Sequence, residues 1–193
     1  MRTSAHDAAP EEGAGKAAHG AGEAALCERL VRGDRAAAGE FYDAYAPRVR
    51  RYIAVSLGSF GTRQDAEDLT QETFISMAEA LPFFRGESSL FTFACAIAHR
   101  KVQSFIRVGA RRARIAATID PPGHPGESSA RDEVLSRALG ALDPDYRELL
   151  HLKYAEDASV AEIAAIRAES EHAVESRLAR ARRALKRLME DQR

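Results

Sequence analysis

Apolar residues recur at every third or fourth position through most of the chain, which is the period of helices that bury one face. In the first half, one such run joins Phe41, Tyr45, Val49 and Ile53. No segment shows a convincing alternation of apolar and polar residues, which would indicate a strand. The pattern predicts an all-α fold.

Helix start signals divide this pattern into elements, because Ser, Thr and Asp side chains can accept from the free N–H groups of a first helical turn. Pro144 suits the first position of its helix, and Glu162 completes a capping box with the residue three before it. The expected N-caps are Asp34, Thr62, Ser88 or Ser89, Asp143, Ser159 and Ser170.

Changes in composition predict two small helical domains joined by a flexible linker. Residues 1–22 are rich in Ala, Gly and charge without an apolar period, and we expect a disordered tail there. Residues 109–130 hold three prolines and three glycines, as a linker would. The two helical domains are then 23–108 and 131–193.

Composition narrows the class of protein. With 7% aromatic residues and no Trp, the chain suits two small cores better than one thick core. The longest uninterrupted apolar run, Phe93 to Ala98, is far shorter than the ~20 residues of a membrane span, and no signal stretch is present. Cys27 and Cys95 show neither metal spacing nor a disulfide framework, so we expect a cytosolic protein without a metal or cofactor.

The formal net charge of −1 conceals two strongly basic stretches. Residues 99–114 contain six Lys or Arg and no acid, and residues 177–187 again contain six and no acid. Such stretches are typical of polyanion binding, and a flexible linker would let both engage one extended polymer. A solvated helix face is the alternative interpretation of each.

The segment DAEDLTQETF, residues 65–74, carries the opposite charge. On a helix, Asp65, Asp68 and Glu72 share one exposed face. This face either docks on a basic protein surface or is a solvated helix start in which Asp65 complements the helix dipole. Periodicity alone is compatible with both.

The last two predicted helices have helix-turn-helix proportions. The first covers residues 159–166, and the second runs from Ser170 to about Met189. In this motif the second helix reads bases near its N-terminus, and Arg180 and Arg183 could reach the flanking phosphates.

Taken together, these segments resemble the extracytoplasmic-function (ECF, group 4) sigma factors of bacterial RNA polymerase. The resemblance spans about residues 26–189 and rests on order and spacing as well as on the motifs. In chain order the motifs are DAEDLTQETF, ALPFFRGESSLFTFACAIAHRK, LDPDYRELLHLKYAEDASVAEIA and VESRLARARRALKRLM. The resemblance implies a sigma region 2 domain over 23–108 and a sigma region 4 domain over 131–193, which together direct core polymerase to promoters.

The resemblance implies two sites in region 2. One docks on the clamp helices of the beta and beta-prime subunits through Asp65, Glu67, Asp68, Gln71 and Glu72. The other melts the minus 10 element of promoter DNA, which needs aromatics to stack on unstacked bases and cations along the backbone. Its residues are Phe84, Arg85, Ser88, Ser89, Phe91, Phe93, Arg100, Lys101 and Arg107. Core packing is the alternative for Phe91 and Phe93.

The resemblance further implies that region 4 reads the minus 35 element as duplex and that the linker threads the polymerase cleft. The implied minus 35 residues are Ser170, His172, Glu175, Ser176, Arg177, Arg180 and Arg183. The turn departs from the family pattern, because Ala168 stands where a Gly is usual and would adopt a positive φ at greater cost. Glu175 replaces a common cation, although a glutamate can accept from cytosine N4.

Two other functions fit the sequence less well. A helix-turn-helix regulator without polymerase docking would leave DAEDLTQETF and the FFRGESS loop without a role. An enzyme is disfavoured because the chain lacks a phosphate loop, a metal cluster and a nucleophile motif. We interpret Cys95 and His99 as a core thiol beside a surface basic residue.

The family also implies the cellular setting. A sigma factor recruits catalysis and performs none, so we expect no catalytic residue and no small-molecule substrate. The expected partners are core RNA polymerase, promoter DNA and an anti-sigma factor. The protein would be cytoplasmic and nucleoid-associated, held at the membrane through an anti-sigma factor but not inserted into it.

Overall fold

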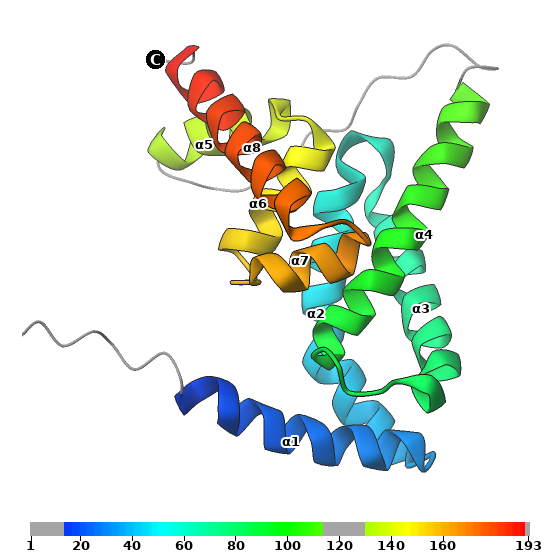
Figure 1. Cartoon of the computed structure of the whole chain (residues 1–193). Helices are drawn as coiled ribbons and strands as arrows, with labels where there is room; N and C mark the ends of the chain where they lie inside the picture. The colour runs from blue at the N-terminus through cyan, green and yellow to red at the C-terminus, as the bar shows by residue number, and fades with distance from the viewer. Residues whose placement is uncertain (1–13, 114–129, 192–193) are drawn as a thin grey trace, which may run out of the picture.

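The regular elements of the computed structural model, which describes residues 14–113 and 130–191, are all helical (Figure 1). The prediction of an all-α fold is confirmed over this part of the chain. The α-helices are α1 (Ala14–Val31), α2 (Arg35–Leu57), α3 (Arg63–Ala80), α4 (Leu90–Ala113), α5 (Ala130–Ala141), α6 (Pro144–Tyr154), α7 (Val160–Arg167) and α8 (Glu171–Asp191). Two short 3-10 turns are η1 (Gly58–Phe60) and η2 (Leu81–Phe83).

Side chains cap the helices where the sequence predicts them. The Asp34 carboxylate accepts from the N–H of Ala36 at 2.8 Å, and Ser170 Oγ accepts from the N–H of Ala173 at 3.2 Å. Thr62 with Asp65, and Ser159 with Glu162, form complete capping boxes. The start of α4 has two caps. Ser89 Oγ accepts from the N–H of Thr92 at 3.0 Å, and Glu23 of α1 accepts from the N–H of Leu90.

The structure differs from the sequence prediction at both expected boundaries. Residues 14–22 are helical rather than part of a disordered tail, and 1–13 lie outside the described residues. Later residues of α1 pack against the core, and this packing extends a helix whose first nine residues include three glycines that disfavour it. Similarly, α4 continues past 108 to Ala113, and the predicted linker residues 114–129 lie outside the described residues.

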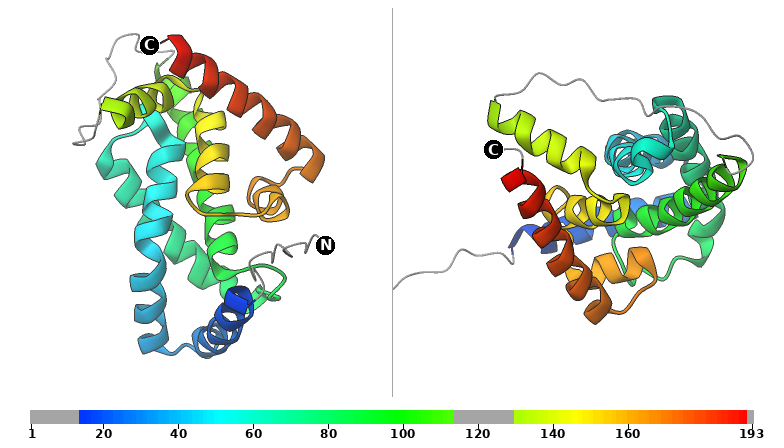
Figure 2. Two further views of the ribbon diagram at one scale, coloured as in Figure 1. Left: turned by 90° about the vertical axis from the view of Figure 1, so that its left-hand side faces the viewer. Right: turned by 90° about the horizontal axis from the view of Figure 1, so that it is seen from above.

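The helices form two units that pack directly against each other. The first unit (14–113) is a bundle of α2, α3 and α4, with α1 lying across one end (Figures 1 and 2). In the second unit (130–191), α6, α7 and α8 pack together and α5 lies against α8. Helix α6 lies on α2 and α7 lies on α4, so the buried apolar side chains of both units form one continuous cluster.

The turn between α7 and α8 contains a strained residue. Ala168 follows α7 with φ 53° and ψ 44°, in the left-handed region that a Cβ disfavours. The N–H of Ala168 donates to the carbonyl of Ala164 and so completes the last turn of α7. The N–H of Glu169 donates to the same carbonyl at 3.0 Å. The sequence predicted a positive φ at Ala168, at a greater cost in free energy than for a glycine. The structure confirms the left-handed conformation there.

We expect Ala168→Gly to stabilise the protein by about 0.5–1 kcal/mol, because glycine adopts this conformation without the Cβ clash. Chemical denaturation followed by circular dichroism would measure the change. As a matched control, Ala165→Gly in the exposed part of α7 should destabilise by about 1 kcal/mol, since its position is helical. Equal destabilisation by both substitutions would contradict the assigned strain.

Candidate polymerase and nucleic-acid interfaces

The acidic residues of α3 form an exposed face along one side of the first unit. Asp68 and Gln71 are exposed, and the Glu72 side chain is 59% exposed. Glu67 is less available because Arg63 lies 3.0 Å from its carboxylate. Asp65 is occupied by the capping box at the start of α3. Of the five predicted docking residues, Asp68, Gln71 and Glu72 are therefore the ones that face solvent without a capping role.

An apolar groove of about 600 Å³ adjoins this face, between α1, α2 and α3. Gln71 lines it, and so do Tyr42 and Ile75, whose side chains are 44% and 61% exposed. An acidic rim beside exposed apolar side chains suits a protein surface that combines apolar residues with cations. The sequence did not single out Tyr42 or Ile75, since neither belongs to the stripe of buried apolar residues on its helix.

The loop between α3 and α4 exposes one aromatic ring and packs another. Phe83 is 82% exposed, whereas Phe84 packs on Phe93 with ring centroids 4.8 Å apart. Arg85 is exposed beside them. The minus 10 residues predicted from the sequence start with Phe84 and do not include Phe83. The pair of adjacent Phe residues directly after Pro82 is the sequence feature that could have identified Phe83.

Phe91 does not fit its predicted role in this conformation. Its side chain is 8% exposed, and the guanidinium of Arg48 lies 3.8 Å from the ring centroid. The ring also stacks near Tyr45, at 6.5 Å between centroids. The alternative of core packing is therefore the one observed for Phe91. Ser88 and Ser89 are half-buried, and Ser89 serves as a cap.

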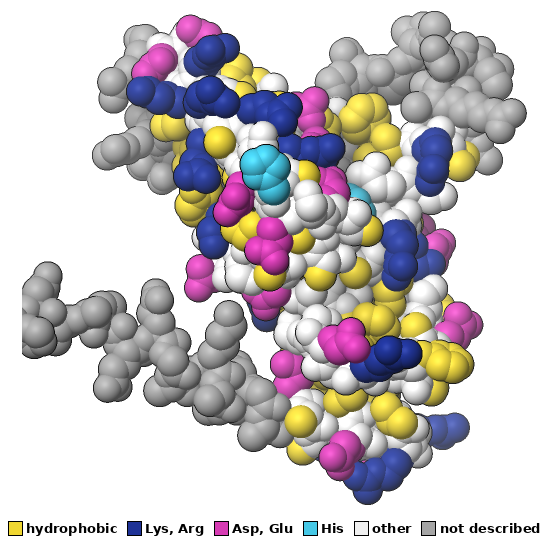
Figure 3. All heavy atoms as spheres, viewed as in Figure 1, with side chains coloured by type: hydrophobic (Ala, Val, Ile, Leu, Met, Phe, Trp, Pro, Cys, Tyr) yellow, Lys and Arg dark blue, Asp and Glu magenta, His cyan; other side chains and the backbone are white. Residues whose placement is uncertain are grey.

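Three predicted backbone-binding cations lie along α4. Arg100 and Arg107 are exposed, and Lys101 lies 3.5 Å from the carboxylate of Glu72 in α3. Lys and Arg side chains gather over α4 and over α8 (Figure 3). Basic surface therefore occurs in both units, as the segment charges predicted.

The exposed face of α8 brings together most of the predicted minus 35 residues. His172, Ser176, Arg180 and Arg183 follow at helical spacing on the side opposite the buried residues of α8. Arg180 also donates to Ser176 Oγ at 3.1 Å. Ser170 and Glu175 are exposed as well.

Arg177 is held differently from its neighbours. Its guanidinium lies 3.3 Å from Asp145 and 3.1 Å from Glu169, so both its partners belong to the second unit. The side chain is 38% exposed. In this conformation Arg177 is part of an ion-pair network rather than a free contact for DNA.

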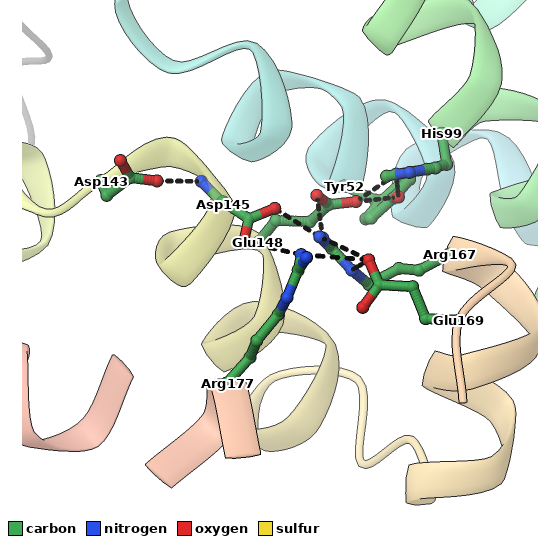
Figure 4. A network of polar contacts seen from close by, with 8 residues as sticks. All are labelled: Tyr52, His99, Asp143, Asp145, Glu148, Arg167, Glu169 and Arg177. Atoms are coloured by element: carbon green, nitrogen blue, oxygen red, sulfur yellow. Dashed lines mark hydrogen bonds and ion pairs between the residues drawn. The ribbon is translucent and has the colours of Figure 1, made fainter. Parts of the chain in front are cut away.

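That network continues to the contact between the two units (Figure 4). Arg167 contacts Asp145, lies 3.3 Å from Glu169, and donates to Glu148 at 2.6 Å. Across the contact, Glu148 accepts from Tyr52 and lies 2.8 Å from Nδ1 of His99.

His99 is therefore not the surface residue that the sequence suggested. Its side chain is 12% exposed because it lies between the two units and pairs with Glu148. Nothing local in the sequence signals this pairing, since 49 positions separate the two residues.

The buried groups of the network have shifted pKa values. Burial alone would raise the pKa of Glu148, but the hydrogen bond from His99 and the charges of His99 and Arg167 lower it below its usual value. Burial and the Glu148 charge raise the pKa of Tyr52 well above its usual value, so the phenol stays a donor. Burial likewise raises the pKa of the Cys95 thiol.

Within residues 14–113 and 130–191, no group of three or more His, Cys, Asp or Glu side chains is arranged to hold a metal ion. None of the helices in this part of the chain has the length and hydropathy needed to cross a membrane.

Comparison with known proteins agrees with the architecture. Residues 41–112 match the family Sigma-70 region 2, and residues 132–185 match Sigma-70, region 4. The RNA polymerase sigma factor NccH of Alcaligenes xylosoxydans xylosoxydans is 32% identical over 178 residues, covering 86% of this chain and 94% of that protein. The ECF RNA polymerase sigma factor BldN of Streptomyces coelicolor is 30% identical over 175 residues, covering 86% of this chain and 65% of BldN.

Solved structures show the same arrangement of helices. The sigma factor RpoE from Bartonella quintana, in complex with the anti-sigma factor NepR, matches with a TM-score of 0.67 and 26% identity, covering 80% of this chain and 98% of that one. CnrH in complex with the cytosolic domain of CnrY matches in fold, with a TM-score of 0.65, 24% identity, and coverage of 89% and 99%.

These matches define a two-domain transcription initiation factor with sigma regions 2 and 4. The chain belongs to the ECF sigma factors of bacterial RNA polymerase.

Proposed function

We propose that this sigma factor binds core RNA polymerase through the acidic face of α3 and contacts the promoter through two basic surfaces, one in each unit. The observation that carries the proposal is the segregation of opposite charges onto α3 and onto α4 and α8. Docking would use Asp68, Gln71 and Glu72, with the neighbouring apolar groove adding buried area. The capping role of Asp65 makes its contribution to docking indirect.

The minus 10 element would be held at the loop before α4. Phe83 offers an exposed ring on which an unstacked base can stack, and Arg85, Arg100 and Arg107 can follow the backbone. We add Phe83 to the predicted set and assign Phe91 to the core. Phe84 and Phe93 then support the loop through their mutual packing.

The minus 35 element would be read by the exposed face of α8 in the major groove. His172 and Ser176 lie in its leading turns, and Arg180 and Arg183 follow on the same face toward flanking phosphates. A regulator that lacks polymerase docking is the weaker proposal, because a match to Sigma-70 region 2 covers residues 41–112.

Control by an anti-sigma factor is part of the proposal, since the RpoE structure is a complex with the anti-sigma factor NepR. The protein itself would catalyse nothing and would act in the cytoplasm, with any membrane attachment supplied by its regulator. The linker between the units would thread the polymerase cleft.

Reversing the charge of the α3 face tests polymerase docking. We expect Asp68→Lys with Glu72→Lys to abolish binding to core polymerase, because two attractive contacts become repulsive. Co-elution with core polymerase in gel filtration measures this. Glu28→Lys with Glu40→Lys, which makes the same change in net charge on α1 and α2, is the control and should still co-elute. Loss of binding by both variants would contradict a specific role for α3.

Phe83→Ala tests the minus 10 surface. Because the ring is exposed, its loss should leave the free energy of unfolding unchanged. Affinity of the holoenzyme for a single-stranded minus 10 oligonucleotide should fall by about 1–3 kcal/mol, the size of a base–aromatic stack. The control is Phe60→Ala, which removes a ring that is 53% exposed at η1. An equal loss in both variants would refute the assignment of Phe83.

Arg180→Ala tests the phosphate contacts of α8. Removing one phosphate contact should reduce the slope of log affinity against log salt concentration by about one. The measurement is holoenzyme binding to duplex promoter DNA over a range of salt concentrations. Arg182→Ala, on the flank of α8, should leave the slope unchanged. An unaltered slope for Arg180→Ala would remove this residue from the contact.

A further inference from the structure

Helix α1 contacts both ends of the loop that carries the proposed minus 10 surface. This loop, residues 84–89, joins η2 to α4. Helix α1 packs against η2, and the carboxylate of its Glu23 accepts from the N–H of Leu90, the first residue of α4. Figure 1 shows α1 passing beneath the loop at the end of the bundle. Each end of the loop is therefore in contact with the same helix.

The Glu23 carboxylate is the partner of a buried backbone group. Leu90 is fully buried, so its N–H needs an acceptor within the protein. At the start of a helix no carbonyl of the same helix can serve. Ser89 Oγ accepts from the N–H of Thr92, which leaves the N–H of Leu90 to Glu23. The negative charge of Glu23 also interacts favourably with the N-terminal end of the helix dipole.

Tyr45 of α2 orients this carboxylate. Its hydroxyl donates, over 3.4 Å, to the same Glu23 oxygen that accepts from Leu90. Burial and the charge of Glu23 raise the pKa of Tyr45, so the phenol stays a donor. The Tyr45 ring packs on Phe41 at 4.7 Å between centroids and lies 6.5 Å from Phe91. Three helices, α1, α2 and α4, therefore meet at Glu23.

The middle of the loop is open to solvent. Arg85, Gly86 and Glu87 are exposed, and Gly86 has a φ of 72°. A Cβ added at Gly86 would meet no residue beyond its neighbours within 4 Å. A segment with so few packing contacts takes its conformation from its ends. Phe83 and Arg85, which are proposed to contact the minus 10 strand, lie close to the end that packs on α1.

We propose that Glu23 is a positioning residue for minus 10 recognition, which holds the start of α4 so that Phe83 and Arg85 are presented to an unstacked base and its phosphate. This inference rests on the proposed function of the loop. A carboxylate repels the DNA backbone, so Glu23 acts through the loop rather than by touching DNA. The residues matched by Sigma-70 region 2 begin at 41, so α1 lies outside them.

Substitution of Glu23 tests this role through DNA affinity, measured at a temperature where the variants are folded. Glu23→Ala leaves the N–H of Leu90 without its acceptor, so a smaller fraction of molecules has the loop in the binding conformation. We expect the variant holoenzyme to bind a single-stranded minus 10 oligonucleotide about tenfold more weakly than the wild type. Glu23→Gln keeps an oxygen that can accept from this N–H, and its affinity should stay within about twofold of the wild type.

A matched control on the same helix is Glu28→Ala, which removes the same charge from α1. Glu28 is exposed and pairs with Arg32 of its own helix, so this variant should bind the oligonucleotide like the wild type. The affinity of Glu23→Ala for core polymerase should be unchanged, and so should that of its holoenzyme for duplex minus 35 DNA. The acidic face of α3 and the exposed face of α8 are formed by other elements.

Hydrogen exchange of the free protein gives a second measurement. In Glu23→Ala, peptides covering residues 84–92 should exchange faster, while peptides from α6 and α8 keep their wild-type rates. If circular dichroism shows that Glu23→Ala is unfolded, Tyr45→Phe replaces it, because that change removes only the hydroxyl that donates to Glu23. We expect Tyr45→Phe to weaken oligonucleotide binding by about threefold.

Three results would overturn the inference. The first is wild-type oligonucleotide affinity in the folded test variant, and the second is an equal loss in Glu28→Ala. The third is tighter binding, since the carboxylate would then block the start of α4 against phosphate instead of positioning the loop. If the wild-type holoenzyme itself does not bind the oligonucleotide, the proposed function fails. Exchange of residues 84–92 would still report whether Glu23 orders the loop.

Discussion

The carboxylate of Glu148 is the constraint on which the arrangement of this molecule depends. A carboxylate that is 2% exposed is tolerated only when donors replace the water it has lost. The donors come from three other helices, through Tyr52 on α2, His99 on α4 and Arg167 at the end of α7. Because α6 carries Glu148 itself, the four helices must meet at one point for the charge to be satisfied, and this fixes how the two units pack.

The same charge also shapes the helix-turn-helix. Arg167, which neutralises Glu148, is the last residue of α7 and directly precedes the left-handed Ala168. Its guanidinium contacts Asp145 and Glu169, and Arg177 of α8 shares both of these acids. The orientation of α8 relative to α6 and α7 is thus tied to the ion pairs that lie behind the turn. A strained backbone at Ala168 is retained because the surrounding contacts over-determine it.

Local features of the fold could be predicted from the sequence, and contacts between distant residues could not. The caps at Asp34 and Ser170, and the strain at Ala168, depend on residues within four positions of each other. Tyr52 and Glu148, in contrast, are 96 positions apart, and no periodicity connects them. The burial of Phe91 beneath Arg48 could not be predicted from the sequence either, because an aromatic residue at that spacing suits both a core and a DNA-binding surface. The sequence was enough to place the exposed acidic and basic side chains on helix faces. It was not enough to identify the side chains with which they form ion pairs.

The two charged surfaces are neighbours, and this adjacency has an energetic consequence. Lys101 on α4 lies 3.5 Å from Glu72 on α3, with the Glu72 side chain 59% exposed, so the pair is worth about 0–1 kcal/mol in water. A pair this weak is readily exchanged for other partners. A cation of the polymerase that takes Glu72 leaves Lys101 available for a phosphate, and a phosphate that takes Lys101 leaves Glu72 available for the polymerase. On the site assignments proposed above, each partner would therefore lower the free-energy cost of binding the other, although the charges sum to nearly zero in the free chain.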